Sequence, residues 1–172
     1  MFTFVAVLAM ATEVAPQVPQ YDTLRSDDAR ISVLYRPEAR ERAEALLQYF
    51  EESLPLPGLP VDVPRRAEIV LAPSEALFNE AVGGRVPEWG AAVAIPGESR
   101  IVLPGYGSDR GRWNEPQTLR HEWAHLGLHG YLNGLRIPRW FSEGYAEWAS
   151  GGWDWSEGWR LRLLLARGGN RL

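Results

Sequence analysis

All three histidines of this 172-residue chain fall within nine residues, from His121 to His129. Residues four apart in an α-helix lie on one face, so a helix through this segment would let His121 and His125 present two imidazole nitrogens to one metal ion. Glu122 would lie one residue around the helix, close enough to reach a water molecule on that ion. The segment therefore favours a fold in which one helix carries a metal-binding face.

The residues around the histidines favour a helix over about 115–129. Residues 114–116 supply a capping asparagine, an acidic first turn and a proline at a position that tolerates it. Gly130 is placed to end the helix. An apolar stripe recurs at helical spacing and is expected to face the core: Leu119, Trp123 and Leu126.

A catalytic zinc ion usually takes three protein ligands and a water molecule. The candidates for the third ligand are His129, Glu143 and Glu147. His129 lies eight residues after His121, about 12 Å along the helix axis, so three ligands on one straight helix cannot converge on one ion. We therefore interpret His129 as a helix-end cation or a residue of a pocket wall.

A second helix is predicted to begin at Pro138 and to end at Gly151 and Gly152. It follows the first helix after a short turn rich in glycine and asparagine. Two helices joined in this way can face each other across a metal ion. Because Glu143 lies on the second helix, this arrangement favours it over His129 as the third ligand.

The segment H-E-W-A-H at 121–125, followed by P-R-W-F-S-E-G-Y-A-E-W at 138–148, resembles the gluzincin metallopeptidases, and more narrowly the small bacterial peptidase-MA-like domains. The resemblance implies a Zn²⁺-dependent hydrolase of peptide bonds in which Glu122 is the general base. It implies for Glu147 a carboxylate that orients a ligand histidine, the alternative being an exposed helix carboxylate. The implied zinc ligands are His121, His125 and Glu143.

A β-hairpin is predicted from Trp89 to Leu103, with its turn at 96–99. An edge strand can hold an extended peptide by main-chain pairing, and the alternative is ordinary sheet structure. Tyr145 is a further candidate for substrate contact. The partner of the reaction's oxyanion stays open among Tyr145, Tyr106 and Arg139. The candidate residues of the substrate strand are Ala91, Ala92, Val93 and Ala94.

The remaining periodicity predicts an α+β fold, in which a small mixed sheet with an edge hairpin packs on helices. The resemblance implies that this fold is zincin-like. It also implies more helices after the second motif than this chain offers, so we expect a minimal or truncated C-terminal part. The further elements expected are strands at 31–35 and 67–72, and helices at 37–54, at 75–82 after a Ser74 cap, and at 156–166.

Length and composition favour a single domain over 21–172, because 45% hydrophobic content is enough for one core. The net charge of −4, with scattered signs, excludes a nucleic-acid footprint. The expected partner is therefore a peptide or protein substrate, and the oligomeric state is left open. Core packing is the expected role of Trp123, Trp140 and Trp148, the alternative being apolar walls for a substrate side chain.

Residues 1–20 are interpreted as an export segment and linker. The apolar stretch Met1 to Ala11 is too short to span a bilayer, so no stable membrane span is expected. It resembles a secretory signal, although it lacks basic residues, and the alternative is a first strand or a buried segment. The predicted location is secreted or periplasmic, with a cytoplasmic protein as the alternative.

Two other classes of function stay open beside the peptidase. One is a zinc-binding but catalytically weak module that serves in recognition or assembly. The other is a structural domain in which the histidine motif arose by chance, and the second motif argues against it.

Overall fold

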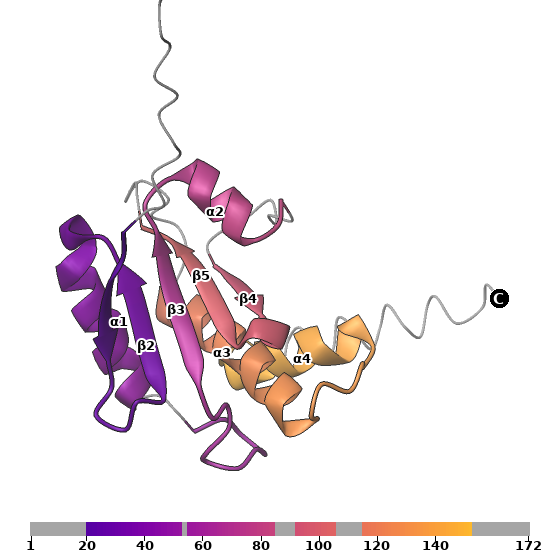
Figure 1. Ribbon diagram of the computed structural model, residues 1–172. Coiled ribbons are helices and arrows are strands. Elements are labelled where there is room, and N and C mark those ends of the chain that lie inside the picture. The colour runs from indigo at the N-terminus through magenta and orange to yellow at the C-terminus, as the bar shows by residue number, and fades with distance from the viewer. Residues whose placement is uncertain (1–19, 53–54, 85–91, 106–114, 153–172) are drawn as a thin grey trace, which may run out of the picture.

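The computed structural model describes residues 20–52, 55–84, 92–105 and 115–152. Its strands are β1 (Asp22–Arg25), β2 (Ile31–Tyr35), β3 (Ala67–Ala72), β4 (Val93–Ile95) and β5 (Arg100–Pro104). They form one five-stranded sheet in the order β1-β2-β3-β5-β4 (Figure 1). The inner pairs β2–β3 and β3–β5 are parallel, whereas β1 and β4 pair antiparallel at the two edges. The sheet is therefore mixed.

Four α-helices accompany the sheet in the described part of the chain, together with short 3₁₀ turns at Pro37–Ala39 and Pro96–Glu98. The α-helices are α1 (Arg40–Glu52), α2 (Glu75–Ala81), α3 (Glu115–Tyr131) and α4 (Arg139–Ala149). The α+β class and the mixed sheet expected from the sequence are confirmed. No helix within the described ranges is long and apolar enough to cross a lipid bilayer.

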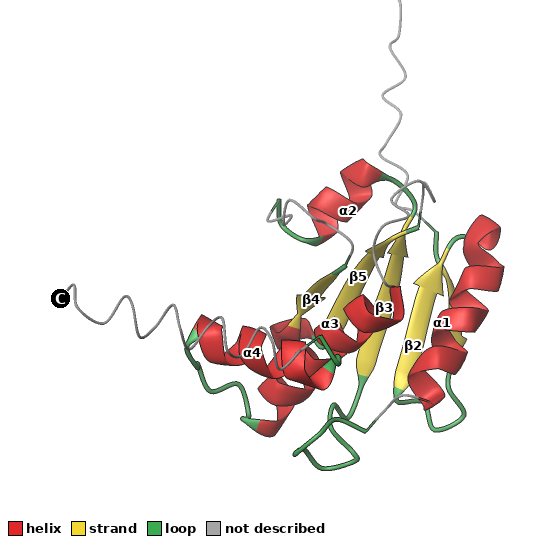
Figure 2. Ribbon diagram, turned by 180° about the vertical axis from the view of Figure 1, so that it is seen from behind, coloured by secondary structure: helices red, strands yellow, loops and turns green. Residues whose placement is uncertain are grey.

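Alternate side chains of the strands point to opposite faces of the sheet and build two separate cores. Ile69 and Leu71 of β3 belong to the larger core, beneath α1 and α3, which lie on the same face of the sheet (Figure 2). Val70 and Ala72 belong to the smaller core, where they pack with Phe78 of α2. Both faces of β3 are thus covered, as its nearly continuous apolar sequence requires.

The apolar face of α3 fixes the helix on the sheet. The predicted stripe of Leu119, Trp123 and Leu126 is confirmed, since each of these side chains is 2% exposed. The ring of Trp123 packs against that of Phe50 from α1, with centroids 5.1 Å apart. Because this face is buried, the adjoining histidine face turns toward α4.

The expected strands at 31–35 and 67–72 match β2 and β3. The Ser74 cap is also confirmed, because its hydroxyl accepts a hydrogen bond from the Leu77 N–H at 3.3 Å. The hairpin is present as β4 and β5, although Trp89 to Ala91 lie outside the described residues. The expected helix at 156–166 and the export segment up to residue 19 also lie outside them.

Three elements differ from the sequence prediction. The helix expected at 37–54 is a 3₁₀ turn at Pro37–Ala39 followed by α1 (Arg40–Glu52), and residues 53–54 lie outside the described residues. The strand β1 was not expected, because the sequence there shows no apolar alternation and the strand forms only by pairing with β2. Gly130 does not end α3, which continues to Tyr131. The helix ends instead where Gly134, at φ 76°, donates its N–H to the carbonyl of His129.

The core role expected for the tryptophans holds for one of three. Trp140 is 75% exposed and Trp148 is 52% exposed, so the prediction that they pack in the core is wrong. The reason is the orientation of α4, which buries the small residues Ala146 and Ala149 and leaves both indoles outside.

Candidate metal centre

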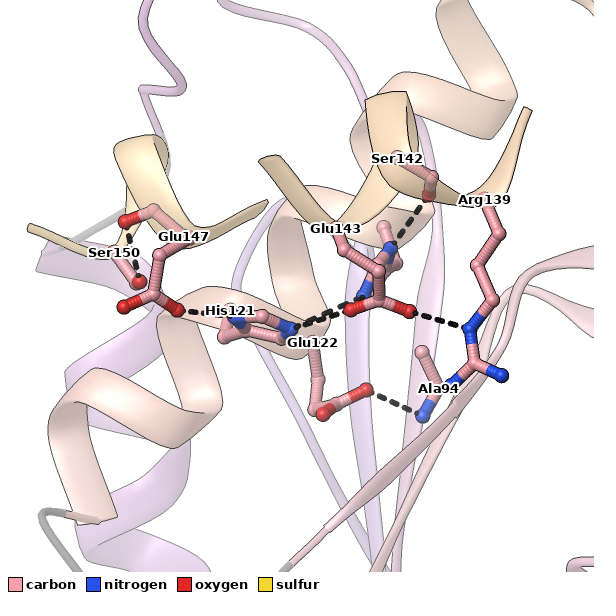
Figure 3. A network of polar contacts seen from close by, with 9 residues as sticks. Ala94, His121, Glu122, Arg139, Ser142, Glu143, Glu147 and Ser150 are labelled. Atoms are coloured by element: carbon pink, nitrogen blue, oxygen red, sulfur yellow. Dashed lines mark hydrogen bonds and ion pairs between the residues drawn. The ribbon is translucent and has the colours of Figure 1, made fainter. Parts of the chain in front are cut away.

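Helices α3 and α4 pack together and bring the two sequence motifs face to face (Figure 3). The Nε2 atoms of His121 and His125 lie 3.2 Å apart. The Oε2 atom of Glu143 lies 3.4 Å from the first nitrogen and 3.5 Å from the second. Three atoms from two helices thus form a nearly equilateral triangle.

The size of this triangle fits a zinc ion. Tetrahedral ligands at about 2.0–2.1 Å from zinc are separated from one another by about 3.3 Å. Two imidazole nitrogens and one carboxylate oxygen are also a donor set typical of catalytic zinc. Among the described residues, His121, His125 and Glu143 are the group able to hold a metal ion in this way.

Helix α4 also contacts the outer nitrogen of each histidine (Figure 3). The Nδ1 atom of His125 lies 2.9 Å from the Oγ atom of Ser142. The Nδ1 atom of His121 lies 3.6 Å from the Oε2 atom of Glu147. Such outer partners fix the orientation and tautomer of an imidazole, so that the inner nitrogen can bind a metal.

Glu122 lies beside the triangle, with its carboxylate turned toward the edge of the sheet (Figure 3). Its Oε2 atom accepts a hydrogen bond from the main-chain N–H of Ala94 at 2.7 Å. Burial raises the pKa of Glu122 to about 7, the Ala94 N–H opposes that rise, and the negative charge of Glu143 adds to it. A carboxyl group with a pKa near neutrality can both accept and return a proton.

The electrostatics of His125 favour its neutral form. Burial and, to a smaller extent, the neighbouring His121 together lower the pKa of His125 to about 4, against the opposing charge of Glu143. The neutral imidazole is the form that binds metal.

Glu143 divides its two oxygens between different partners. Oε2 faces the histidines. Oε1 lies 3.3 Å from the Nε atom of Arg139, one turn earlier on α4. Arg139 is largely exposed. Its guanidinium, a candidate oxyanion partner by sequence, lies against the carboxylate of Glu143 in this structure.

The structure places the other predicted residues as follows. His129 lies in the last turn of α3, outside the triangle, as expected of a helix-end residue. The hydroxyl of Tyr145 donates to the carbonyl of Pro57 at 3.1 Å, and its role in substrate contact stays a prediction. Tyr106 lies outside the described residues.

The predicted substrate strand lies partly within β4. Val93 and Ala94 belong to β4, which is an edge strand of the sheet, and the buried Ala92 directly precedes it. Ala91 lies outside the described residues. The edge position is confirmed, while peptide binding there stays a prediction.

Ser142 and Gly152 are the residues of this site that sequence reasoning missed. A Cβ atom at Gly152 would overlap the carboxylate of Glu147 and lie 2.7 Å from the amide nitrogen of Gln117. The position of Ser142 directly before Glu143, on the predicted second helix, could have indicated its role.

Comparisons with protein-family models, with curated proteins and with solved structures find no match to this chain.

Proposed function

We propose that this chain is a zinc-dependent metallopeptidase with a zincin-like fold. The observation that carries the proposal is the triangle formed by His121, His125 and Glu143, whose 3.2–3.5 Å edges match the ligand spacing of tetrahedral zinc. The sequence resemblance to gluzincins supports the same ligands. Under this proposal the three residues hold the ion, and Glu147 and Ser142 orient the two imidazoles.

When bound, zinc would lower the pKa of a coordinated water molecule and polarise the scissile carbonyl. Glu122 accepts the proton of the attacking water at its carboxylate and passes it to the leaving amine. The substrate class proposed is a peptide or protein.

A metal measurement on purified protein tests the site. Wild type is expected to bind one zinc ion per chain, and Glu143→Ala to bind it at least ten-fold more weakly. Glu44→Gln, which alters an exposed glutamate on α1, is the matched control for removing one negative charge. Full zinc affinity in Glu143→Ala would show that the third ligand lies elsewhere.

A peptide-library digest tests the chemistry. Zinc-loaded wild type is expected to cleave peptide bonds, and Glu122→Gln to lose at least a hundred-fold in kcat while it retains zinc, because general-base catalysis contributes roughly that much. If the protein binds zinc stoichiometrically and shows no hydrolysis that depends on Glu122, the recognition or assembly module is the better description.

A further inference from the structure

The edge strand β4 is joined to the metal centre by one main-chain hydrogen bond. The N–H of Ala94 donates to the Oε2 atom of Glu122 at 2.7 Å (Figure 3). Among the described strands, β4 pairs with β5 alone, and Ala94 stands opposite Ile101 in that pairing. The bond therefore connects the sheet directly to the proposed general base.

The direction of this N–H follows from strand geometry. In an antiparallel pair, alternate residues aim both of their main-chain groups at the partner strand, and the residues between them aim theirs away. Because the Ala94 N–H reaches Glu122, it belongs to the set that faces the free edge, while Val93 and Ile95 face β5. An extended peptide lying along β4 would meet this same edge.

The two oxygens of Glu122 have different surroundings. Oε2 is held by Ala94. Among the described residues, Oε1 has no hydrogen-bond partner and none of the buried side-chain oxygens lacks one, so Oε1 is at least partly open to solvent. The hydrogen bond from Ala94 therefore holds one oxygen of this partly buried carboxylate and leaves the other oxygen open.

We propose that the main-chain N–H of Ala94 is a positioning group for Glu122: it holds Oε2, so that Oε1 is left to receive the proton of the attacking water. This inference rests on the proposed peptidase function. It also implies that a bound peptide does not pair with the N–H of Ala94, and that the Ala94 carbonyl, on the same edge, is the group left for main-chain pairing.

Amide hydrogen exchange on the metal-free protein tests the bond without any catalytic assay. The Ala94 amide is expected to be protected in wild type. In Glu122→Ala it should exchange at least ten-fold faster, because its acceptor is gone. The Val93 and Ile95 amides, which face β5, serve as internal controls and should keep their protection. Unchanged protection of Ala94 in Glu122→Ala would overturn the proposal even if the protein proves to be a peptidase.

A proline at this position removes the N–H, and proline is tolerated where a strand's N–H faces a free edge. Ala94→Pro is compared with Ala94→Ser, which keeps the N–H. We expect kcat of Ala94→Pro to fall roughly ten-fold or more below that of Ala94→Ser, with KM, zinc content and melting temperature alike in the two variants. Equal kcat values in the two folded variants would also overturn the proposal. Absence of hydrolysis in wild type would instead contradict the proposed function, and the exchange result would still decide the bond.

Discussion

The outer nitrogen of His125 lies 2.9 Å from the hydroxyl of Ser142, the residue that directly precedes Glu143 on the facing helix. One turn of α4 thus supplies both a candidate metal ligand and the partner that orients another. A metal centre arranged in this way depends on the rotation of α4 about its own axis, because that rotation sets both contacts together.

Replacing Ser142 with alanine should weaken zinc binding without unfolding the protein. Loss of an outer hydrogen-bond partner typically costs roughly 10- to 100-fold in metal affinity, because the imidazole is no longer held in one orientation. Competition with a chromophoric chelator measures the dissociation constant. Ser32→Ala makes the same chemical change on β2 and should leave the affinity unaltered. Equal affinities for the two variants would contradict the orienting role of Ser142.

Gly152→Ala should act on the metal centre through Glu147. The added Cβ would overlap the carboxylate of Glu147, so that this carboxylate must shift from its present place beside His121. We expect a roughly ten-fold loss of zinc affinity, measured by the same competition. The matched control is Gly144→Ala, because a Cβ there meets nothing within 4 Å. That control should keep the affinity and stabilise α4 by about 0.5–1 kcal/mol, because alanine favours helix more than glycine does.

Trp123 on α3 and Trp140 on α4 should differ sharply in their effect on stability. Trp123→Ala removes a 2% exposed ring from the core and should lower the free energy of unfolding by about 3–5 kcal/mol. Trp140→Ala removes a 75% exposed ring and should change it by less than about 0.5 kcal/mol. Urea denaturation measures both, and Trp123→Phe provides a milder variant if the alanine variant does not fold. Similar losses at the two positions would contradict the buried and exposed placements.

The turn between β1 and β2 should make the free energy of unfolding depend on pH. The main-chain N–H of Arg30 and the hydroxyl of Ser26 both donate to Asp28, and they hold the pKa of its carboxyl below the ordinary value. A depressed pKa in the folded state stabilises the protein above the unfolded pKa of about 3.9, and this contribution is lost as pH falls through the folded value.

Asp28→Asn should therefore lower the free energy of unfolding at pH 7, and the difference from wild type should shrink below about pH 4. Denaturation measured from pH 2 to pH 7 checks this. Asp27→Asn alters the neighbouring exposed aspartate and controls for the loss of one charge. If the difference in the free energy of unfolding stayed constant from pH 2 to pH 7, ionisation of the Asp28 carboxylate would not contribute to stability.

Strands β2 and β3 could be predicted at their observed bounds, because both are apolar segments with clear ends. Strand β1 could not be predicted, since its four residues carry no pattern of their own and form a strand only by pairing with β2. The end of α3 was misplaced for a related reason. A glycine inside a helix and a glycine that ends one look alike in sequence, and the positive φ of Gly134 identifies the end.

The sequence by itself determined which residues of α3 share a face, because the i, i+4 spacing of His121 and His125 is a local property of any helix. Only the tertiary structure decided which groups meet that face. The burial of Trp123 on the sheet and of Ala146 on α4 sets the rotation of the two helices. That rotation brings Glu143 and Ser142 to the histidines and leaves Trp140 and Trp148 outside, because packing between distant segments depends on contacts that no local pattern records.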